Sequence, residues 1–164
     1  MENTKNIILE ILEKNSRVSI EDMAAMLGMN ADDIAAAMDE MIKDQIICGY
    51  TTLVNWDKTD RQFVTAMIEV KVTPQRDRGF EKIAERISGF DEVKAVYLMA
   101  GSYDLLIMMD GKNIRDISYF VSNKLSTLDS VLSTATHFVL KKYKDHGVVL
   151  EKKVEEDERM IVTP

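Results

Sequence analysis

Residues 64–72 read Val-Thr-Ala-Met-Ile-Glu-Val-Lys-Val, and this stretch decides the fold class. Apolar residues occupy every second position from 64 to 72. The intervening positions are Thr65, Met67, Glu69 and Lys71. Because side chains of a strand point alternately to its two faces, a period of two predicts a β-strand with one buried face.

The residues after this strand continue as alternating helical and extended patterns. Phe80 to Ile87 has apolar residues at helical spacing and closes on Ser88-Gly89. The later segments predict a strand over 93–100, a turn at Gly101-Ser102, a strand over 105–109, a helix over 114–125 and a strand over 131–143.

The order β-α-β-β-α-β over residues 63–143 predicts an antiparallel four-stranded sheet with both helices on one face, a ferredoxin-like fold. The opposite face would then carry apolar or weakly polar side chains, expected at Met67, Leu98, His137 and Val139. An exposed apolar sheet face favours association, so we expect a second copy of the chain to pack against it.

The residues before this sheet predict three short helices between residues 4 and 44. Ser19 and Asn30 each precede a helical pattern and have an acid three residues later, which is a helix-start signal. Gly28 falls where the second helix ends. Two short helices joined by a glycine turn are typical of a helix-turn-helix, so the fold class is α+β with this unit first.

Between the two units, residues 46–54 predict a further β segment, and the polar residues 55–61 predict a linker. The expected domains are therefore 1–54 for the helix-turn-helix and its following strand, 62–145 for the sheet domain, and 146–164 for a charged C-terminal tail.

Composition narrows the class of protein. The chain has 164 residues, of which 46% are hydrophobic and 30% charged, as in an ordinary globular protein. No stretch has the roughly 20 apolar residues that a membrane helix needs. Cys48 is the one cysteine, so no intrachain disulfide is possible. With no secretory signal, the cytoplasm is the expected compartment.

Several segments together resemble the Lrp/AsnC family of transcriptional regulators. They are Ile7 to Leu12, Arg17-Val18-Ser19, Met23 to Gly28, Ile46 to Tyr50, Met99-Ala-Gly-Ser-Tyr-Asp-Leu-Leu106 and Thr134-Ala-Thr136. The resemblance extends from residue 1 to about residue 144. It implies a helix-turn-helix, a strand that links the domains, and a ferredoxin-like domain of the RAM (amino-acid metabolism) type.

The resemblance also implies a function. Members of this family pair through the sheet, often assemble into octamers, and bind a small effector, typically an amino acid, between subunits. The chain is therefore expected to bind double-stranded DNA as a homodimer or larger homo-oligomer. An amino acid or a related metabolite would modulate that binding, and no cofactor or metal is expected.

The expected DNA contacts combine cations for phosphates with short polar side chains, and they are Arg17, Ser19, Asn30, Lys43 and Lys58. The charge of the third helix departs from this expectation. It carries Asp32, Asp33, Asp39 and Glu40 on its outside, where phosphate binding needs cations. An alternative is therefore a metabolite-binding interaction module whose acidic helix-turn-helix does not bind DNA by itself.

The effector site is expected at Gly101, Ser102, Tyr103 and Asp104, with Thr134 and Thr136 of the last strand. A carboxylate can accept from an ammonium group and turn amides can donate to a carboxylate, which suits an amino acid. The alternative is that Tyr103 and Asp104 only shape the turn and the interface.

The chain is not expected to be an enzyme, because no motif for nucleophilic, metal-dependent or nucleotide-dependent catalysis occurs. The family also resembles haem-pathway decarboxylases, which need a histidine-lined pocket. With only His137 and His146 in the chain, that alternative has weak support.

Overall fold

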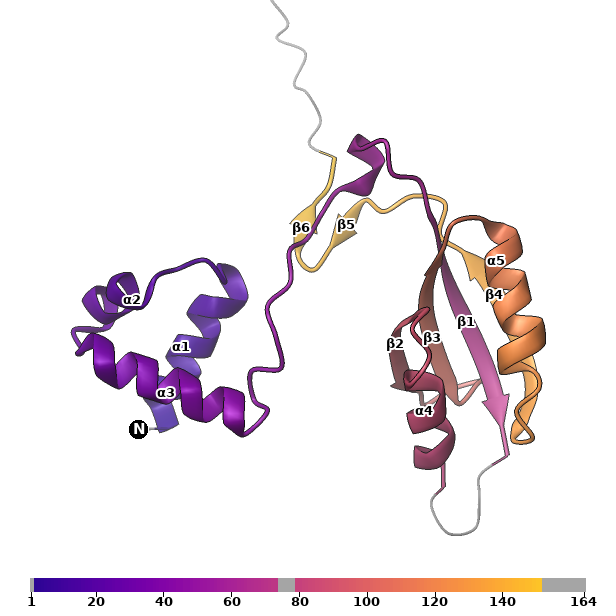
Figure 1. Cartoon of the computed structure of the whole chain (residues 1–164), viewed down its shortest axis with the longest axis horizontal. Coiled ribbons are helices and arrows are strands. Elements are labelled where there is room, and N and C mark those ends of the chain that lie inside the picture. The colour runs from indigo at the N-terminus through magenta and orange to yellow at the C-terminus, as the bar shows by residue number, and fades with distance from the viewer. Residues whose placement is uncertain (1, 74–78, 152–164) are drawn as a thin grey trace, which may run out of the picture. The chain divides into compact units, whose positions relative to one another are not determined.

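The computed structural model describes residues 2–73 and 79–151, so positions 152–164 of the expected tail lie outside the described residues. The chain divides into two compact units, Met1–Leu53 and Val54–Pro164. Figure 1 shows the helices of the first unit and the sheet of the second, and each unit is described by itself below.

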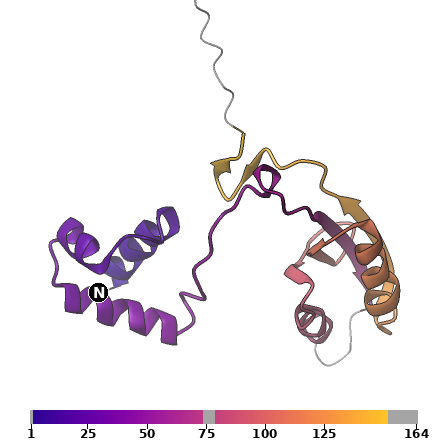
Figure 2. The ribbon, with the colours of Figure 1, turned by 45° about the horizontal axis from the view of Figure 1, so that its top comes forward.

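The first unit consists of three helices, α1 (Glu2–Lys14), α2 (Ile20–Leu27) and α3 (Ala31–Lys43). They pack around one apolar core, as the helical spacing predicts, and Figure 2 shows them grouped together. The buried core residues are Ile8, Leu12, Met23, Ala24, Ile34 and Met41.

The ends of these helices are fixed by local hydrogen bonds. The Ser19 hydroxyl accepts from the backbone amide of Asp22 at 3.0 Å, and the Asn30 side chain accepts from the amide of Asp32 at 3.3 Å. Gly28 ends α2 in the left-handed region at φ 62°, which costs a glycine little. These positions confirm the predicted helix starts and the turn between α2 and α3.

The strand expected over residues 46–54 does not form, and this prediction is wrong. Gln45 adopts a left-handed φ of 57°, and the amides of Ile46 and Ile47 both donate to the carbonyl of Met41. Residues 46–51 then line a groove together with α1, where no neighbouring strand offers backbone partners. Cys48 lies exposed in this segment, and its thiol donates to the Gln45 carbonyl.

The second unit has the predicted β-α-β-β-α-β order. Its elements are β1 (Val64–Val72), α4 (Glu81–Ser88), β2 (Val93–Leu98), β3 (Leu105–Gly111), α5 (Ile114–Phe120) with a π-helical turn (Val121–Leu125), and β4 (Val131–Phe138). All neighbouring strands are antiparallel, in the order β2-β3-β1-β4. Both helices contribute to one core with the inward face of β1, so they cover the same side of the sheet (Figure 1).

The strand register shows which of the expected residues lie on the open face of the sheet, and Leu98 does not. Met67 pairs with Met108 and His137, and these three side chains lie on the face that no helix covers. Leu98, however, pairs with the buried Leu105 and therefore lies on the helix side. The register shift between Val93 and Ala95 moves the alternation of β2 by one residue, which is why simple alternation misplaced Leu98.

The residues that flank this sheet pack together. Trp56–Lys58 forms a 3₁₀ turn within the expected linker, and Trp56 contacts Phe63 edge-on at 5.8 Å. After Phe138 the chain leaves the sheet and forms a short hairpin of β5 (Lys144–Asp145) and β6 (Val148–Val149). The Asn55 side-chain amide donates to the Leu150 carbonyl at 3.0 Å, which joins the segment before β1 to the segment after β4.

Candidate functional site

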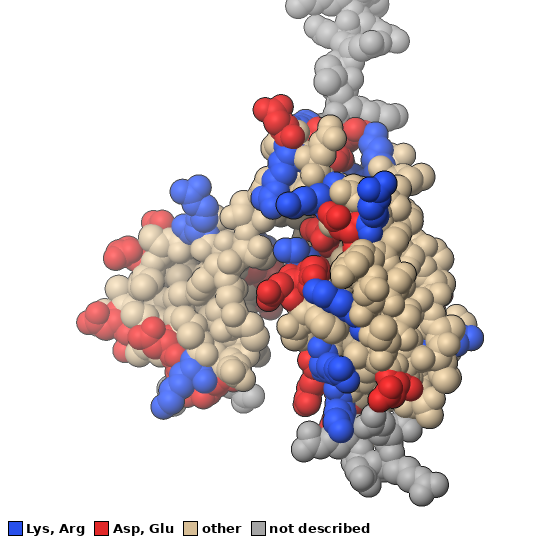
Figure 3. Space-filling model, turned by 45° about the vertical axis from the view of Figure 1, so that its right-hand side comes forward, with Lys and Arg blue, Asp and Glu red and all other residues tan. Residues whose placement is uncertain are grey.

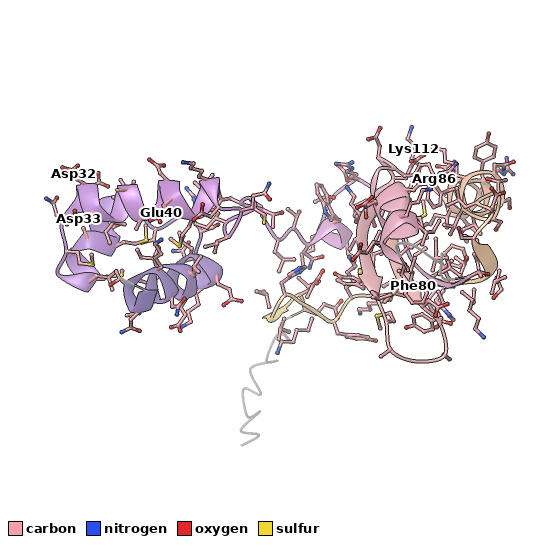
Figure 4. All side chains as sticks on the ribbon, turned by 90° about the horizontal axis from the view of Figure 1, so that it is seen from below. Asp32, Asp33, Glu40, Phe80, Arg86 and Lys112 are labelled. Atoms are coloured by element: carbon pink, nitrogen blue, oxygen red, sulfur yellow. The ribbon has the colours of Figure 1, made fainter. Side chains whose placement is uncertain are left out.

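The third helix of the first unit has an acidic exposed surface. Asp32, Asp33, Asp39 and Glu40 are all exposed, and Ile34 and Met41 anchor the opposite side of α3 in the core. Figure 4 shows Asp32 and Asp33 near one end of the helix and Glu40 further along it. Asp32 and Asp33 lie in the first turn, where the helix dipole favours negative charge.

Few cations balance this surface. Residues 1–53 contain ten acids and four bases, and red side chains dominate the margin of this unit in Figure 3. Lys5 of α1 pairs with Glu40, with its Nζ 2.7 Å from Oε2. Lys43, in the last turn, is the only basic residue of α3. A duplex approaching α3 would therefore meet more carboxylates than cations.

The structure distributes the expected DNA-contact residues over both units. The side-chain oxygens of Ser19 and Asn30 accept from helix-start amides, and Arg17 and Lys43 are exposed. Lys58 lies in the 3₁₀ turn of the second unit. The set therefore does not form one patch within the helical unit.

In the second unit, Asp104 closes the loop between β2 and β3. Its carboxylate Oδ2 accepts from the backbone amide of Val72 at 2.9 Å. Its backbone amide donates to the Val70 carbonyl, and its carbonyl accepts from the Met99 amide. One oxygen of the Asp104 carboxylate is thus bonded to the end of β1. This is a structural role, as in the alternative that Asp104 only shapes the turn.

Two neighbouring residues of the same loop line a small cavity. Ser102 and Tyr103 lie there with Glu69 and Lys71 of β1, and the cavity has a volume of about 270 Å³. Ser133, Thr134 and Ala135 of β4 complete the lining. Glu69 and Lys71 carry opposite charges and lie two residues apart on the open face of the sheet. Oε1 of Glu69 also lies 3.3 Å from Nε2 of His137.

The two threonines expected at this site lie on the same face of β4, and only one of them borders the cavity. Thr134 pairs with Val70 and Thr136 with Ile68, both buried residues of β1, so both threonines lie on the helix-covered side of the sheet. Of the two, only Thr134 borders the cavity, between Ser133 and Ala135. Gly101 is exposed in the loop beside Ser102. Sequence reasoning missed Glu69 and Lys71 as site residues, although the alternation of residues 64–72 already placed both on the outward face.

Residues 2–73 and 79–151 offer neither a membrane span nor a metal site. In that part of the chain no helix is both long and apolar enough to span a bilayer. Over the same residues, no group of three or more histidine, cysteine or acidic side chains has the arrangement of a metal site.

A helix-turn-helix unit followed by a ferredoxin-like unit is the arrangement of a two-domain transcriptional regulator. The model of the Lrp/AsnC ligand binding domain matches residues 65–149. YugG of Bacillus subtilis, named an uncharacterized HTH-type transcriptional regulator, is 49% identical over 158 residues, which cover 96% of this chain and 95% of that protein. The chain belongs to the Lrp/AsnC family of transcriptional regulators, so it is not an enzyme.

More distant relatives agree with this assignment. LrpA of Pyrococcus horikoshii is 28% identical over 138 residues, covering 84% of this chain and 95% of its own. AsnC of E. coli has the same fold, with a TM-score of 0.65 at 24% identity over 87% of this chain and 93% of its own. The regulator NMB0573 of Neisseria meningitidis, solved as an L-Met complex, has a TM-score of 0.69 at 21% identity. The match covers 88% of this chain and 93% of that one.

Proposed function

We propose that this protein binds duplex DNA as a homodimer or larger homo-oligomer, and that an amino acid bound at the 270 Å³ cavity modulates its binding. The main support for the effector site is that Glu69 and Lys71 line that cavity together with Ser102 and Tyr103. Such a regulator would act where the chromosome lies, in the cytoplasm of a bacterial or archaeal cell.

The charges of the cavity suit a zwitterion. The Lys71 ammonium can donate to an α-carboxylate, and the Glu69 carboxylate can accept from an α-ammonium group. Ser102 adds a hydroxyl, and Tyr103 adds a ring with a phenolic group. A volume of about 270 Å³ admits a single amino acid rather than a larger metabolite.

The open face of the sheet supports self-association. Met67, Leu106 and Met108 are half-buried on it, and Tyr97 is exposed there. Because these apolar side chains neighbour the effector cavity, a second copy on this face would also approach the cavity. An effector bound between copies would bias their relative placement and so the spacing of paired recognition helices.

A thermal-shift screen of the standard amino acids tests the effector. A binding amino acid at 100 times its Kd stabilises the folded protein by about 2.7 kcal/mol, which a melting curve resolves. Lys71→Gln should abolish the shift, whereas Lys82→Gln, which removes an exposed cation of α4 away from the cavity, should keep it. If no amino acid raises the Tm of the unmodified protein, the effector proposal is wrong.

The acidic surface of α3 favours one alternative function, a metabolite-binding interaction module without DNA affinity of its own. Fluorescence anisotropy with a labelled random duplex at low ionic strength separates the two. Salt-sensitive binding supports the regulator that contacts DNA directly. An amino-acid response without any binding to duplex DNA supports the interaction module.

A further inference from the structure

We propose that a basic groove at the start of the second unit binds the phosphate backbone of duplex DNA and supplies cations that α3 lacks. The inference rests on the proposed DNA-binding function and adds a contact surface outside the helix-turn-helix. The groove is formed by the residues that lead into β1 and by those that follow β3.

The groove is large and open, with a volume of about 940 Å³. The segment from Trp56 to Val64 forms one side, and the segment from Lys112 to Arg115 forms the other. The pairing of Val64 with Gly111 brings these two segments together at one end of the sheet. In Figure 1 this end lies beside the β5–β6 hairpin.

Three cations and one acid line this groove. The cations are Arg61, Lys112 and Arg115, all exposed, and the acid is Asp57. None of the ion pairs found among residues 2–73 and 79–151 involves any of the three cations. Figure 4 shows Lys112 at the outer margin of the unit.

The surroundings leave these cations available to a ligand. Asp116 uses Oδ2 to accept from the Lys112 backbone amide, and Asp110 uses Oδ1 to accept from the Thr65 hydroxyl. The Arg61 guanidinium lies 4.9 Å from the centre of the Trp56 ring. A cation–π contact of this kind restrains the Arg61 side chain, and its N–H groups remain able to donate to phosphate oxygens.

Charge complementarity selects DNA as the occupant. Each phosphate that a protein neutralises releases counterions, and this release supplies most of the sequence-independent affinity. The helical unit has only four basic residues against ten acids, so it supplies little of that affinity. Thr59, Gln62 and Asn113 in the lining are neutral groups of the kind that hydrogen-bond to phosphates and sugars.

The test compares the full-length protein with the triple variant Arg61→Gln, Lys112→Gln, Arg115→Gln. The control is Lys82→Gln, Arg86→Gln, Lys94→Gln, which removes three exposed cations of α4 and β2 that do not line the groove. Affinity for a labelled random duplex is measured by anisotropy over a series of salt concentrations. Circular dichroism melts establish that both variants remain folded.

The groove variant should lose affinity at least about tenfold at low salt, and its slope of log K against log salt should fall by about 2 to 3, because three phosphate contacts are lost. The control should keep the slope of the unmodified protein. If the groove variant binds like the control, the groove does not contact DNA, although the proposed function stands. If the unmodified protein binds no duplex, both proposals fail.

Discussion

The carboxylate of Asp104 accepts a hydrogen bond from the backbone amide of Val72, with Oδ2 2.9 Å from the nitrogen. Val72 is the last residue of β1, and the pairing of β1 with β4 shifts register between Lys71 and Val72. The side chain of Asp104 thus serves as a backbone acceptor at a point where the strand ladder ends. This contact ties the loop between β2 and β3 to the central strand β1.

Replacing this acceptor should destabilise the second unit. In Asp104→Ala, the amide of Val72, a residue only 3% exposed, loses its partner, which should cost about 1–3 kcal/mol of unfolding free energy. Asp104→Asn keeps an acceptor oxygen and should recover most of that loss. Urea unfolding at a fixed protein concentration measures both, and equal stability of all three proteins would refute the role given to Asp104.

Gly111 should tolerate no side chain, because a Cβ there would lie 2.8 Å from Cγ1 of Ile117. Ile117 is fully buried in the core, so a shift of its side chain would disturb its packed neighbours. Gly111→Ala should therefore lower the unfolding free energy by about 1–3 kcal/mol. Gly49→Ala is the matched control, since a Cβ at Gly49 meets nothing within 4 Å. A Gly111→Ala protein as stable as the control would contradict this packing.

The contact between Glu92 and Lys124 should make stability depend on pH. The hydrogen bond from Lys124 lowers the pKa of Glu92 below its ordinary 4.5. A lowered folded-state pKa stabilises the fold above the unfolded value, and this contribution is lost as pH falls through the lowered pKa. The pair is partly exposed, so its worth is at most about 1 kcal/mol.

Glu92→Gln should therefore be less stable than the unmodified protein near neutral pH and equally stable well below pH 4.5. Chemical unfolding across this range measures the difference. If the two proteins differed in unfolding free energy by the same amount at every pH, the ionic contact with Lys124 would not be the cause of the difference.

Neutralising α3 should strengthen DNA binding. Asp39→Asn removes an exposed carboxylate from the outer face of the helix, and the affinity for duplex DNA should rise about two- to fivefold at low salt. Glu85→Gln, an equal charge change on α4, should have a smaller effect. Equal effects of the two changes would show that only net charge matters and that α3 does not face the duplex.

A charge on the open sheet face should weaken self-association. Met67 lies between Met108 and His137 on that face, so Met67→Glu should raise the dimer Kd at least about tenfold. Tyr119→Glu, at an exposed position of α5, should leave the dimer intact. Sedimentation over a range of protein concentrations measures the dimer Kd of both variants. If the unmodified protein is monomeric at every concentration, the proposed pairing through this face is wrong.

Periodicity predicted most of the fold because the sheet core follows the alternation of β1 closely. It failed where a local irregularity intervenes, as at Leu98, whose face depends on a register shift within β2. It also failed over residues 46–54, where Ile46, Tyr50 and Leu53 are exposed and the segment has no strand partner within the unit. Strand propensity alone does not provide that partner.

The candidate effector site was only partly predictable. Ser102 and Tyr103 could be named because a turn between two strands was evident and matched a family segment. Glu69 and Lys71 lie far from this turn in sequence, and only the pairing of β1 with β3 brings them to it. The groove around Arg61 and Lys112 depends on the same pairing and left no local signal.

The pairing of β1 with both β3 and β4 also determines when the sheet can be completed during synthesis. The helical unit needs only contacts close in sequence, so it can fold while the rest of the chain is still being synthesised. The sheet cannot be completed until residues 131–138 have left the ribosome. Until then one edge of β1 is unpaired, and an unpaired strand edge can pair with another chain.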